Sequence, residues 1–417
     1  MTGKTESELP ARASEPLIGK THTELQAIAQ EFGMPRFAAA QIAQWLYRKR
    51  VGSLDAMTNL SKAQRAALAG RYAVGLTPPV SVAQSRDGTR KYLFPTASGR
   101  LVESVYIPDG DRATLCVSSQ VGCRMGCLFC MTGKQPWGGN LTAAEILNQV
   151  LAVPESDRLT NIVMMGMGEP LDNADAVLTA LDVLTAPWGL AWSPHRITLS
   201  TIGHLGHLPA FLDRTDCHLA VSLHSPFADE RLRLMPVERA YPTADLLALL
   251  HRYDFSRQRH LTFEYIVFRG LNDSDRHARA LVRLLRGLDC KVNLIRFHAI
   301  PDDGRTHSDL RVSDLRTTDD GAMERLRDTL CRHGLTATIR ASRGEDIFAA
   351  CGMLSGLRVG VTAASASVPG DGNASAPCDG NASMLSGGHA SVPSDGNASV
   401  LSGGNASAPC AGSAQHP

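Results

Sequence analysis

Two hydrophobic periods alternate along the middle of the chain and predict its secondary structure. Between residues 88 and 118, short apolar stretches rich in strand-forming residues indicate strands separated by tight turns. From residue 142 onward, stretches with the helical spacing of three to four residues alternate with short apolar runs typical of buried strands. The expected strands are 89–95, 100–108, 113–119, 159–166, 195–203, 217–224, 261–268, 290–297 and 335–341, and the expected helices are 142–153, 174–184, 205–212, 243–253, 276–288 and 321–334.

The repeated alternation of strand and helix, about six times over, determines the fold class that we expect. Parallel strands need helical crossovers, so the region 111–361 is predicted to form an α/β barrel, open or closed. The β-rich segment 79–110 connects to this core. In such barrels the functional side chains gather at the carboxyl ends of the strands.

Three helices are predicted ahead of the core, in a small helical domain that spans residues 20–78. Thr23 caps the first helix, Pro35 opens the second, and Ser61 caps the third. A group of cations against a single acid, Asp55, suits an RNA phosphate backbone. Solvated helix faces account for the same composition equally well. The cations are Arg36, Arg48, Lys49, Arg50, Lys62, Arg65 and Arg71.

The two ends of the chain have compositions typical of disorder. Residues 1–19 are polar, and residues 362–417 consist mainly of Ala, Ser, Gly, Asn and Pro in imperfect repeats. We expect both segments to be disordered, and we assign no chemistry to Cys378 and Cys410 within the repeats. Four Asn-Ala-Ser triplets match a glycosylation sequon, but no secretory signal accompanies them.

The composition of the chain indicates where in the cell the protein is expected. The 417 residues are 43% apolar, which is enough for a sizeable core, and no apolar run is long enough to cross a membrane. The formal net charge is +1, so overall charge favours no class of partner. We predict a soluble, cytoplasmic monomer. Thiols stay reduced there, so metal binding or catalysis explains the ten cysteines better than a disulfide framework does.

Cys123, Cys127 and Cys130 form a C-x3-C-x2-C loop directly after a predicted strand. This spacing lets three thiolates converge on one inorganic centre. A structural zinc site needs a fourth protein ligand, and no nearby cysteine or histidine pair supplies it. A [4Fe-4S] cluster with three thiolates keeps one iron open for an exchangeable ligand. A reduced zinc knuckle or chance packing is the alternative.

The loop resembles that of the radical S-adenosylmethionine superfamily, whose cosubstrate chelates the open iron. The stretch "MMGMGEP" resembles the superfamily's glycine-glutamate segment, in which Gly168 and Glu169 meet the methionine amino group. The resemblance implies a partial (β/α)6 barrel with one three-cysteine [4Fe-4S] cluster and S-adenosylmethionine. By position and resemblance, Ser200, Ser222, Leu223 and His224 line the cosubstrate pocket. Any polar residue among them, taken singly, is more often a satisfied side chain at a barrel rim.

A closer resemblance covers residues 20–357. The stretches "TNLSKAQR", "TLCVSSQVGCRMGCLFC" and "RGEDIFAACG" are similar to those of the bacterial dual-specificity RNA adenine-2-methyltransferases. The resemblance implies methylation of carbon 2 of adenine 2503 in 23S rRNA and of adenine 37 in tRNAs, with two S-adenosylmethionine molecules per turnover. It also implies a helix-hairpin-helix-like RNA-binding domain at 20–78 and an external one-electron donor such as flavodoxin or ferredoxin.

The electron-poor carbon 2 explains why such an enzyme needs two further cysteines, since this carbon cannot attack a sulfonium methyl group. In the implied mechanism, Cys351 takes a methyl group from one S-adenosylmethionine, and a deoxyadenosyl radical from a second abstracts hydrogen from that methyl group. The resulting carbon adds to adenine, and Cys116 attacks the Cys351 sulfur to release the RNA and leave a disulfide. Taken singly, both residues would be ordinary buried cysteines.

Glu103 and His298 complete the implied site. By resemblance Glu103 is the proton acceptor, and strand alternation puts it on a mainly apolar face, where its pKa is raised unless the carboxylate is paired. A surface glutamate on an edge strand is the alternative, and Cys116 could remove the proton instead. His298 stands where many relatives carry asparagine, and an imidazole can replace the amide in binding the cosubstrate.

Two other functions remain open, whereas a methylthiotransferase is disfavoured. Methylation of carbon 8 of the same adenine would use the same cysteines. A methylthiotransferase would need three more cysteines upstream, and none precedes Cys116. A non-catalytic iron–sulfur RNA-binding protein would leave Cys116 and Cys351 without a use. The sequence sets neither the balance between rRNA and tRNA, nor the reductant, nor the role of the repetitive tail.

Overall fold

The computed structural model describes residues 14–256 and 259–355. Most of the segment 1–19 and all of the segment 362–417, which were expected to be disordered, lie outside the described residues, as do Cys378 and Cys410. Within the described residues, no helix is both long and apolar enough to span a membrane.

The N-terminal helices begin where side chains satisfy their free backbone N–H groups. α1 (His22–Glu31) starts at Thr21, which forms a capping box with Glu24, so the predicted cap at Thr23 is wrong by two residues. The predicted cap of α3 (Lys62–Ala69) at Ser61 is confirmed, again with a capping box. Between them, α2 (Ala38–Ala43) continues into a π-helical turn.

Several cations of this helical region have partners within the protein. Arg48 donates hydrogen bonds to the carbonyl oxygens of Pro187 and Leu190, and Arg50 forms an ion pair with Asp157. Elsewhere in the region, Arg65 bonds to two backbone carbonyls and Arg71 pairs with Glu31. These side chains therefore serve the fold, and the positive surface expected for RNA is smaller than the sequence suggested.

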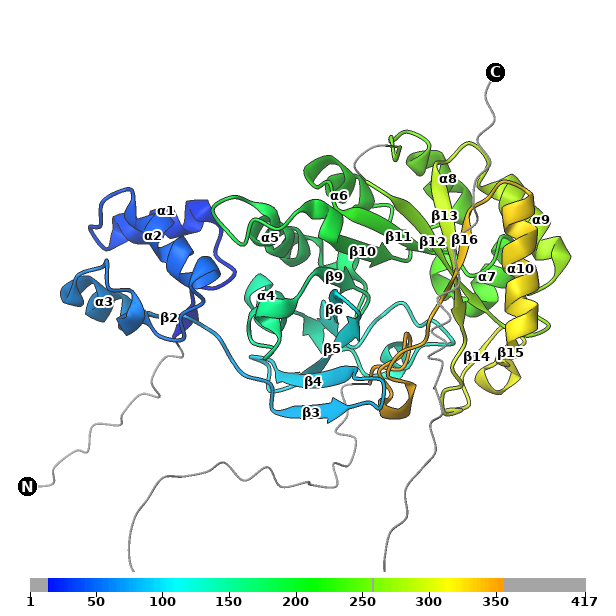
Figure 1. The fold of residues 1–417 in the computed structure, drawn as a ribbon, viewed down its shortest axis with the longest axis horizontal. Coiled ribbons are helices and arrows are strands. Elements are labelled where there is room, and N and C mark those ends of the chain that lie inside the picture. Colours follow the sequence, from blue (N-terminus) through cyan, green and yellow to red (C-terminus); the bar gives the residue numbers. More distant parts are fainter. Residues whose placement is uncertain (1–13, 257–258, 356–417) are drawn as a thin grey trace, which may run out of the picture. The chain divides into compact units, whose positions relative to one another are not determined.

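A ten-stranded sheet forms the centre of the described chain (Figure 1). Its order is β16-β13-β12-β11-β10-β9-β6-β5-β4-β3, with the last four strands antiparallel to one another and the others parallel. The strands are β3 (Ser81–Gln84), β4 (Arg90–Pro95), β5 (Leu101–Asp109), β6 (Arg112–Cys116), β9 (Asn161–Met164), β10 (Ile197–Thr201), β11 (His218–Ser222), β12 (Leu261–Val267), β13 (Cys290–Arg296) and β16 (Ala337–Arg340). Seven parallel strands need six crossovers, as the alternation predicted.

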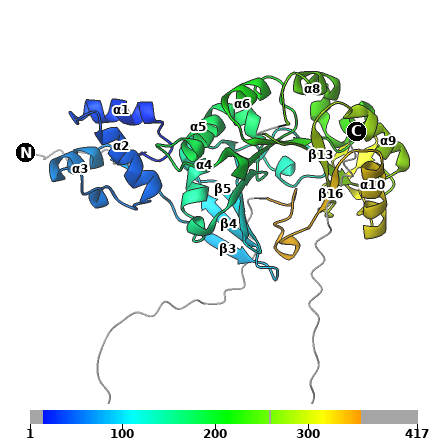
Figure 2. The ribbon, with the colours of Figure 1, turned by 45° about the horizontal axis from the view of Figure 1, so that its top comes forward.

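The crossover helices cover one face of this sheet and form an outer arc around it in Figure 2. They are α4 (Ala143–Leu151), α5 (Ala174–Thr185), α6 (Leu208–Arg214), α8 (Thr243–Leu250), α9 (Asp275–Leu284) and α10 (Asp320–Arg332), with the short α7 (Ala228–Leu234) after β11. β3 and β16 are the two edges, so the barrel is open within the described residues. The predicted α/β fold is confirmed, although β3 and α7 were missed.

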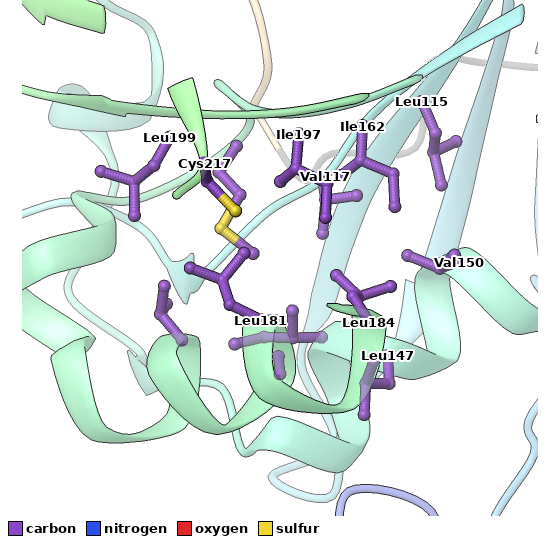
Figure 3. Packing of buried hydrophobic residues seen from close by; sticks show 14 of the residues in the cluster. Leu115, Val117, Leu147, Val150, Ile162, Leu181, Leu184, Ile197, Leu199 and Cys217 are labelled. Carbon is purple, nitrogen blue, oxygen red and sulfur yellow. The ribbon is translucent and has the colours of Figure 1, made fainter. Parts of the chain in front are cut away.

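Strand alternation separates the core from the site. Ile197 and Leu199 on β10 point toward the helices, where Leu181 and Leu184 of α5 meet them (Figure 3). Ser200, between Leu199 and the strand end, faces the opposite side. Each leucine or isoleucine buried in this layer stabilises the fold by roughly 1.5–3 kcal/mol.

Arg231 of α7 ties the carboxyl ends of β10 and β11 together. Its guanidinium is completely buried and donates to the carbonyl oxygens of Ile202 (2.7 Å), Ser222 (3.0 Å) and Leu223 (3.2 Å). It also forms an ion pair with the buried Glu238. Because the strands end at these carbonyls, the arginine fixes the edge on which the site is built.

Replacing Arg231 with methionine is expected to lower the free energy of unfolding by about 3–5 kcal/mol, because Glu238 is left buried without its counterion. Urea denaturation measures the change. The matched control is Arg233→Met on the same helix, whose partner Asp309 has a side chain that is 74% exposed. That control is expected to cost less than about 1 kcal/mol, and equal losses in the two variants would contradict the assignment.

Candidate active site

A cavity of about 170 Å³ opens at the carboxyl ends of the parallel strands. Most of the residues predicted for the site line it, although they come from segments far apart in the sequence. They are Cys116, Cys123, Cys127, Cys130, Gly168, Glu169, Ser200, Ser222, His224 and Cys351. Glu103, Leu223 and His298 were also predicted and do not line this cavity.

The three cysteines of the loop are partly buried and open into the same space. Burial raises the pKa of the Cys123 thiol to about 12, and burial together with the neighbouring Cys130 and Cys123 raises that of Cys127. Thiols in such surroundings become thiolates when metal ions bind them. The loop that carries Cys123, Cys127 and Cys130 begins directly after β7 (Gln120–Val121), so this strand places the three cysteines.

The chemistry of this donor set fits an iron–sulfur cluster. Three thiols from one short loop line the same cavity, and thiolates are the ligands that hold such clusters. Each thiolate would bind a different iron atom. Cys123, Cys127 and Cys130 are therefore the residues that would hold a [4Fe-4S] cluster here.

Glu169 lies deep in the cavity with its carboxylate held by three donors. These are the Thr201 hydroxyl (2.6 Å) and the backbone N–H groups of Ile202 (3.0 Å) and Leu171 (3.1 Å). Burial raises the pKa of Glu169 to about 7, against the opposing effect of these hydrogen bonds. A fixed carboxylate in this position can accept a hydrogen bond from the amino group of a ligand.

His224 adopts a left-handed backbone conformation with φ of 58° at the end of β11. Its Nδ1 accepts a hydrogen bond from the Ile266 N–H (3.0 Å), and its ring packs against Phe129 with centroids 4.8 Å apart. Burial lowers the pKa of His224 to about 3, so the imidazole is neutral. Leu223, one position earlier, is fully buried in the core instead.

Cys116 and Cys351 enter the cavity from opposite ends of the core sequence. Cys116 is the last residue of β6, whereas Cys351 lies in an irregular segment after β16. Burial raises the pKa of Cys116 to about 12, and the neighbouring Cys351 raises it further, while Arg340 opposes both effects. Arg340 ends β16 and has its own pKa raised chiefly by Cys351, with smaller contributions from Glu264 and Cys116.

Arg340 was missed by the sequence analysis. The only signal was a cation at the end of a predicted strand, which is the position where barrels place functional groups. Its guanidinium is half-buried within 4.0 Å of the buried Glu264. A nearby cation favours the ionised form of a thiol, so Arg340 opposes the rise in the pKa of Cys116 that burial causes.

His298 and Glu103 lie elsewhere. A second cavity of about 400 Å³ shares Cys351 and Arg340 with the first, and His298 lines only this second cavity. Its Nε2 is 2.9 Å from the Ser342 hydroxyl, and its Nδ1 is 3.1 Å from the Glu345 carboxylate. Glu103 lines neither cavity and is paired with Lys91.

Gly168 provides a test of the glutamate segment. Its φ of 101° is strained for other residues, and an added Cβ would lie 2.5 Å from the Gln120 Cβ. Gly168→Ala is therefore expected to displace Glu169 and weaken S-adenosylmethionine binding at least tenfold, measured by equilibrium dialysis on the cluster-loaded protein. Gly206→Ala is the matched control, because its Cβ would meet nothing closer than 3.4 Å. Unchanged binding in Gly168→Ala would contradict the placement.

The fold is that of the radical SAM superfamily. The sequence profile of this superfamily matches residues 117–282, and that of the ribosomal RNA large subunit methyltransferase N-terminal domain matches residues 16–74. Membership in the superfamily implies a [4Fe-4S] cluster and S-adenosylmethionine. The crystal structure of a radical SAM methyltransferase from Sphaerobacter thermophilus is 41% identical with a TM-score of 0.73, over 82% of this chain and 100% of that one.

Similar proteins identify the family within this superfamily. A probable dual-specificity RNA methyltransferase RlmN from Bacteroides fragilis is 59% identical over 82% of this chain and 96% of its own length. The dual-specificity RNA methyltransferase RlmN of Syntrophotalea carbinolica is 45% identical over 81% of this chain and 88% of its own. The chain belongs to the RlmN family of dual-specificity RNA methyltransferases, which confirms the predicted enzyme class.

Proposed function

We propose that this protein methylates carbon 2 of adenine in 23S rRNA and in tRNAs, at the adenines implied by its family, through Cys351 and Cys116. The observation that carries the proposal is that these two cysteines, 235 positions apart, line one cavity together with the three cysteines of the loop. Arg340 interacts electrostatically with both thiols. Its charge opposes the rise in the pKa of Cys116 that burial causes, which supports the thiolate needed for the release step.

Each cysteine has a distinct task. The Cys351 thiolate displaces the methyl group from one S-adenosylmethionine and keeps it as a thioether. When bound, the [4Fe-4S] cluster supplies the electron that cleaves a second S-adenosylmethionine into methionine and a deoxyadenosyl radical, the species able to remove hydrogen from that methyl group. The carbon-centred radical on Cys351 then adds to carbon 2 of adenine, and the adduct loses the ring proton and one electron, which the oxidised cluster would take back. Attack of the Cys116 thiolate on the Cys351 sulfur breaks the carbon–sulfur bond and leaves a disulfide. The electron pair of the broken bond goes to the former methyl carbon, which takes up a proton.

The remaining residues bind and orient. Glu169 holds the amino group of S-adenosylmethionine, and Ser200, Ser222 and His224 contact the rest of it at the ends of β10 and β11. A one-electron donor of the flavodoxin or ferredoxin type supplies electrons to the cluster. An external reductant reopens the disulfide. The proton on carbon 2 leaves to Glu103 or to Cys116.

Isotope labelling tests this route. The cluster-loaded protein is incubated with unmodified RNA, dithionite and S-adenosylmethionine carrying a CD3 group. The RNA is then digested, and the nucleosides are separated and identified by mass spectrometry. We expect 2-methyladenosine that retains two deuterium atoms, because one is abstracted before transfer. Retention of all three would indicate direct displacement. A product that co-migrates with 8-methyladenosine would refute the ring position, and the absence of deoxyadenosine would refute catalysis.

A Cys116→Ala variant is expected to accumulate a covalent protein–RNA adduct, because the thiol that releases Cys351 is missing. A slower band that carries RNA on a denaturing gel and disappears with nuclease measures the adduct. Cys290→Ala is the control, since Cys290 is half-buried at the start of β13 and lines neither cavity. Normal turnover of the Cys116 variant without an adduct would exclude the assigned roles.

A further inference from the structure

The segment that carries Cys351 has little regular structure of its own. Residues 344–355 follow β16 and include one short 3-10 turn, Glu345–Ile347. Gly344, Phe348 and Gly352 all have positive φ, and for Phe348 the value of 53° is strained because it carries a side chain. A segment with this backbone keeps its conformation only when its surroundings hold it.

The surroundings include a buried ion pair on the antiparallel part of the sheet. Lys91 on β4 and Glu103 on β5 lie diagonally on the same face, since Leu93 is the direct partner of Glu103. The Lys91 Nζ is 3.1 Å from the Glu103 Oε1, and the two side chains are only 5% and 1% exposed. Figures 1 and 2 both show the segment after β16, in orange, beside these strands.

The free hydrogen-bonding groups of this pair both reach the Cys351 segment. Lys91 Nζ donates to the carbonyl oxygen of the strained Phe348 (3.2 Å), and the second oxygen of Glu103 accepts from the Ser355 N–H (2.8 Å). One contact lies three residues before Cys351 and the other four residues after it. The pair therefore holds the chain on both sides of the thiol.

Stability alone does not explain a buried pair in this place. Removing two charges from water costs several kcal/mol for each ion, and well-packed apolar residues of similar size are often equally stable. Apolar residues could not bond to the Phe348 carbonyl or the Ser355 N–H. Other contacts hold parts of the segment, such as the Met131 N–H to the Gly352 carbonyl (2.7 Å). Lys91 and Glu103 differ from these in being buried charged side chains that hydrogen-bond to the backbone of the segment.

We propose that Lys91 and Glu103 are positioning residues that hold the segment 344–355 so that the Cys351 thiol faces the cavity it shares with Cys116. The use of that thiol rests on the proposed function, whereas its placement does not. Glu103 then contributes before any chemistry on adenine, whether or not it later accepts a proton. This role also accounts for a carboxylate that lines neither cavity.

The decisive variant is the double replacement Lys91→Met, Glu103→Leu. Lys91→Met alone leaves Glu103 buried without a counterion and risks unfolding, whereas the double variant removes both charges and is expected to fold. In the cluster-loaded full chain, hydrogen exchange of the amides in 348–355 is expected to rise at least tenfold, with the barrel strands unchanged. Single-turnover methylation of Cys351, followed by peptide mass, is expected to fall at least tenfold.

Methylation of Cys351 precedes any deprotonation of adenine, so this readout is insensitive to a base function of Glu103. The matched control is the double replacement Arg90→Met, Glu155→Leu, which also removes a buried carboxylate together with its cation from beside Lys91 on β4. Within the described residues, this second pair makes no hydrogen bond to the segment 344–355. The control variant is expected to leave exchange in 348–355 and Cys351 methylation as in the unmodified protein.

Wild-type exchange rates in the double variant would overturn the proposal, as would normal Cys351 methylation. An unmodified protein that never methylates Cys351, while the double variant still exchanges faster, would instead refute the proposed function and leave the positioning role intact.

Discussion

The parallel pairing of seven strands is the constraint on which the rest of this structure depends. Because β6, β9 to β13 and β16 run in one direction, their carboxyl ends meet on one edge, and Cys116, Ser200, Ser222 and Arg340 line one cavity there. Arg231 then fixes that edge, because its buried guanidinium donates hydrogen bonds to four partners there. The apolar residues on the opposite side of the same strands pack against the helices, so one alternation produces both the core and the site.

The features that follow from local sequence were predictable. Hydrophobic periods located the parallel strands and their crossovers, and the spacing of Cys123, Cys127 and Cys130 identified one loop. The features that depend on partners from other strands were not. We expected an apolar face around Glu103, but the Lys91 side chain lies there and pairs with Glu103 diagonally from β4. Nothing in the sequence indicates that pairing.

Smaller misses have the same origin. Thr23 looked like a cap because its hydroxyl precedes an apolar run, but Thr21 has the glutamate at the third position that closes a capping box. α7 is short and highly charged, so its hydrophobic periodicity is weak. Its Arg231 would be expected on the surface from the sequence, and only the carbonyl partners explain its burial. His298 follows a strand that ends near the site, yet its ring turns toward Ser342 and Glu345.

Cys351 borders two cavities at once. The residue therefore belongs both to the lining of the space that holds the loop cysteines and to the lining of a larger, more polar space beside it. A shift of the segment 344–355 alters both spaces together. The hydrogen bonds that Lys91 and Glu103 make with this segment therefore bear on the shape of two cavities, although neither side chain lines either of them.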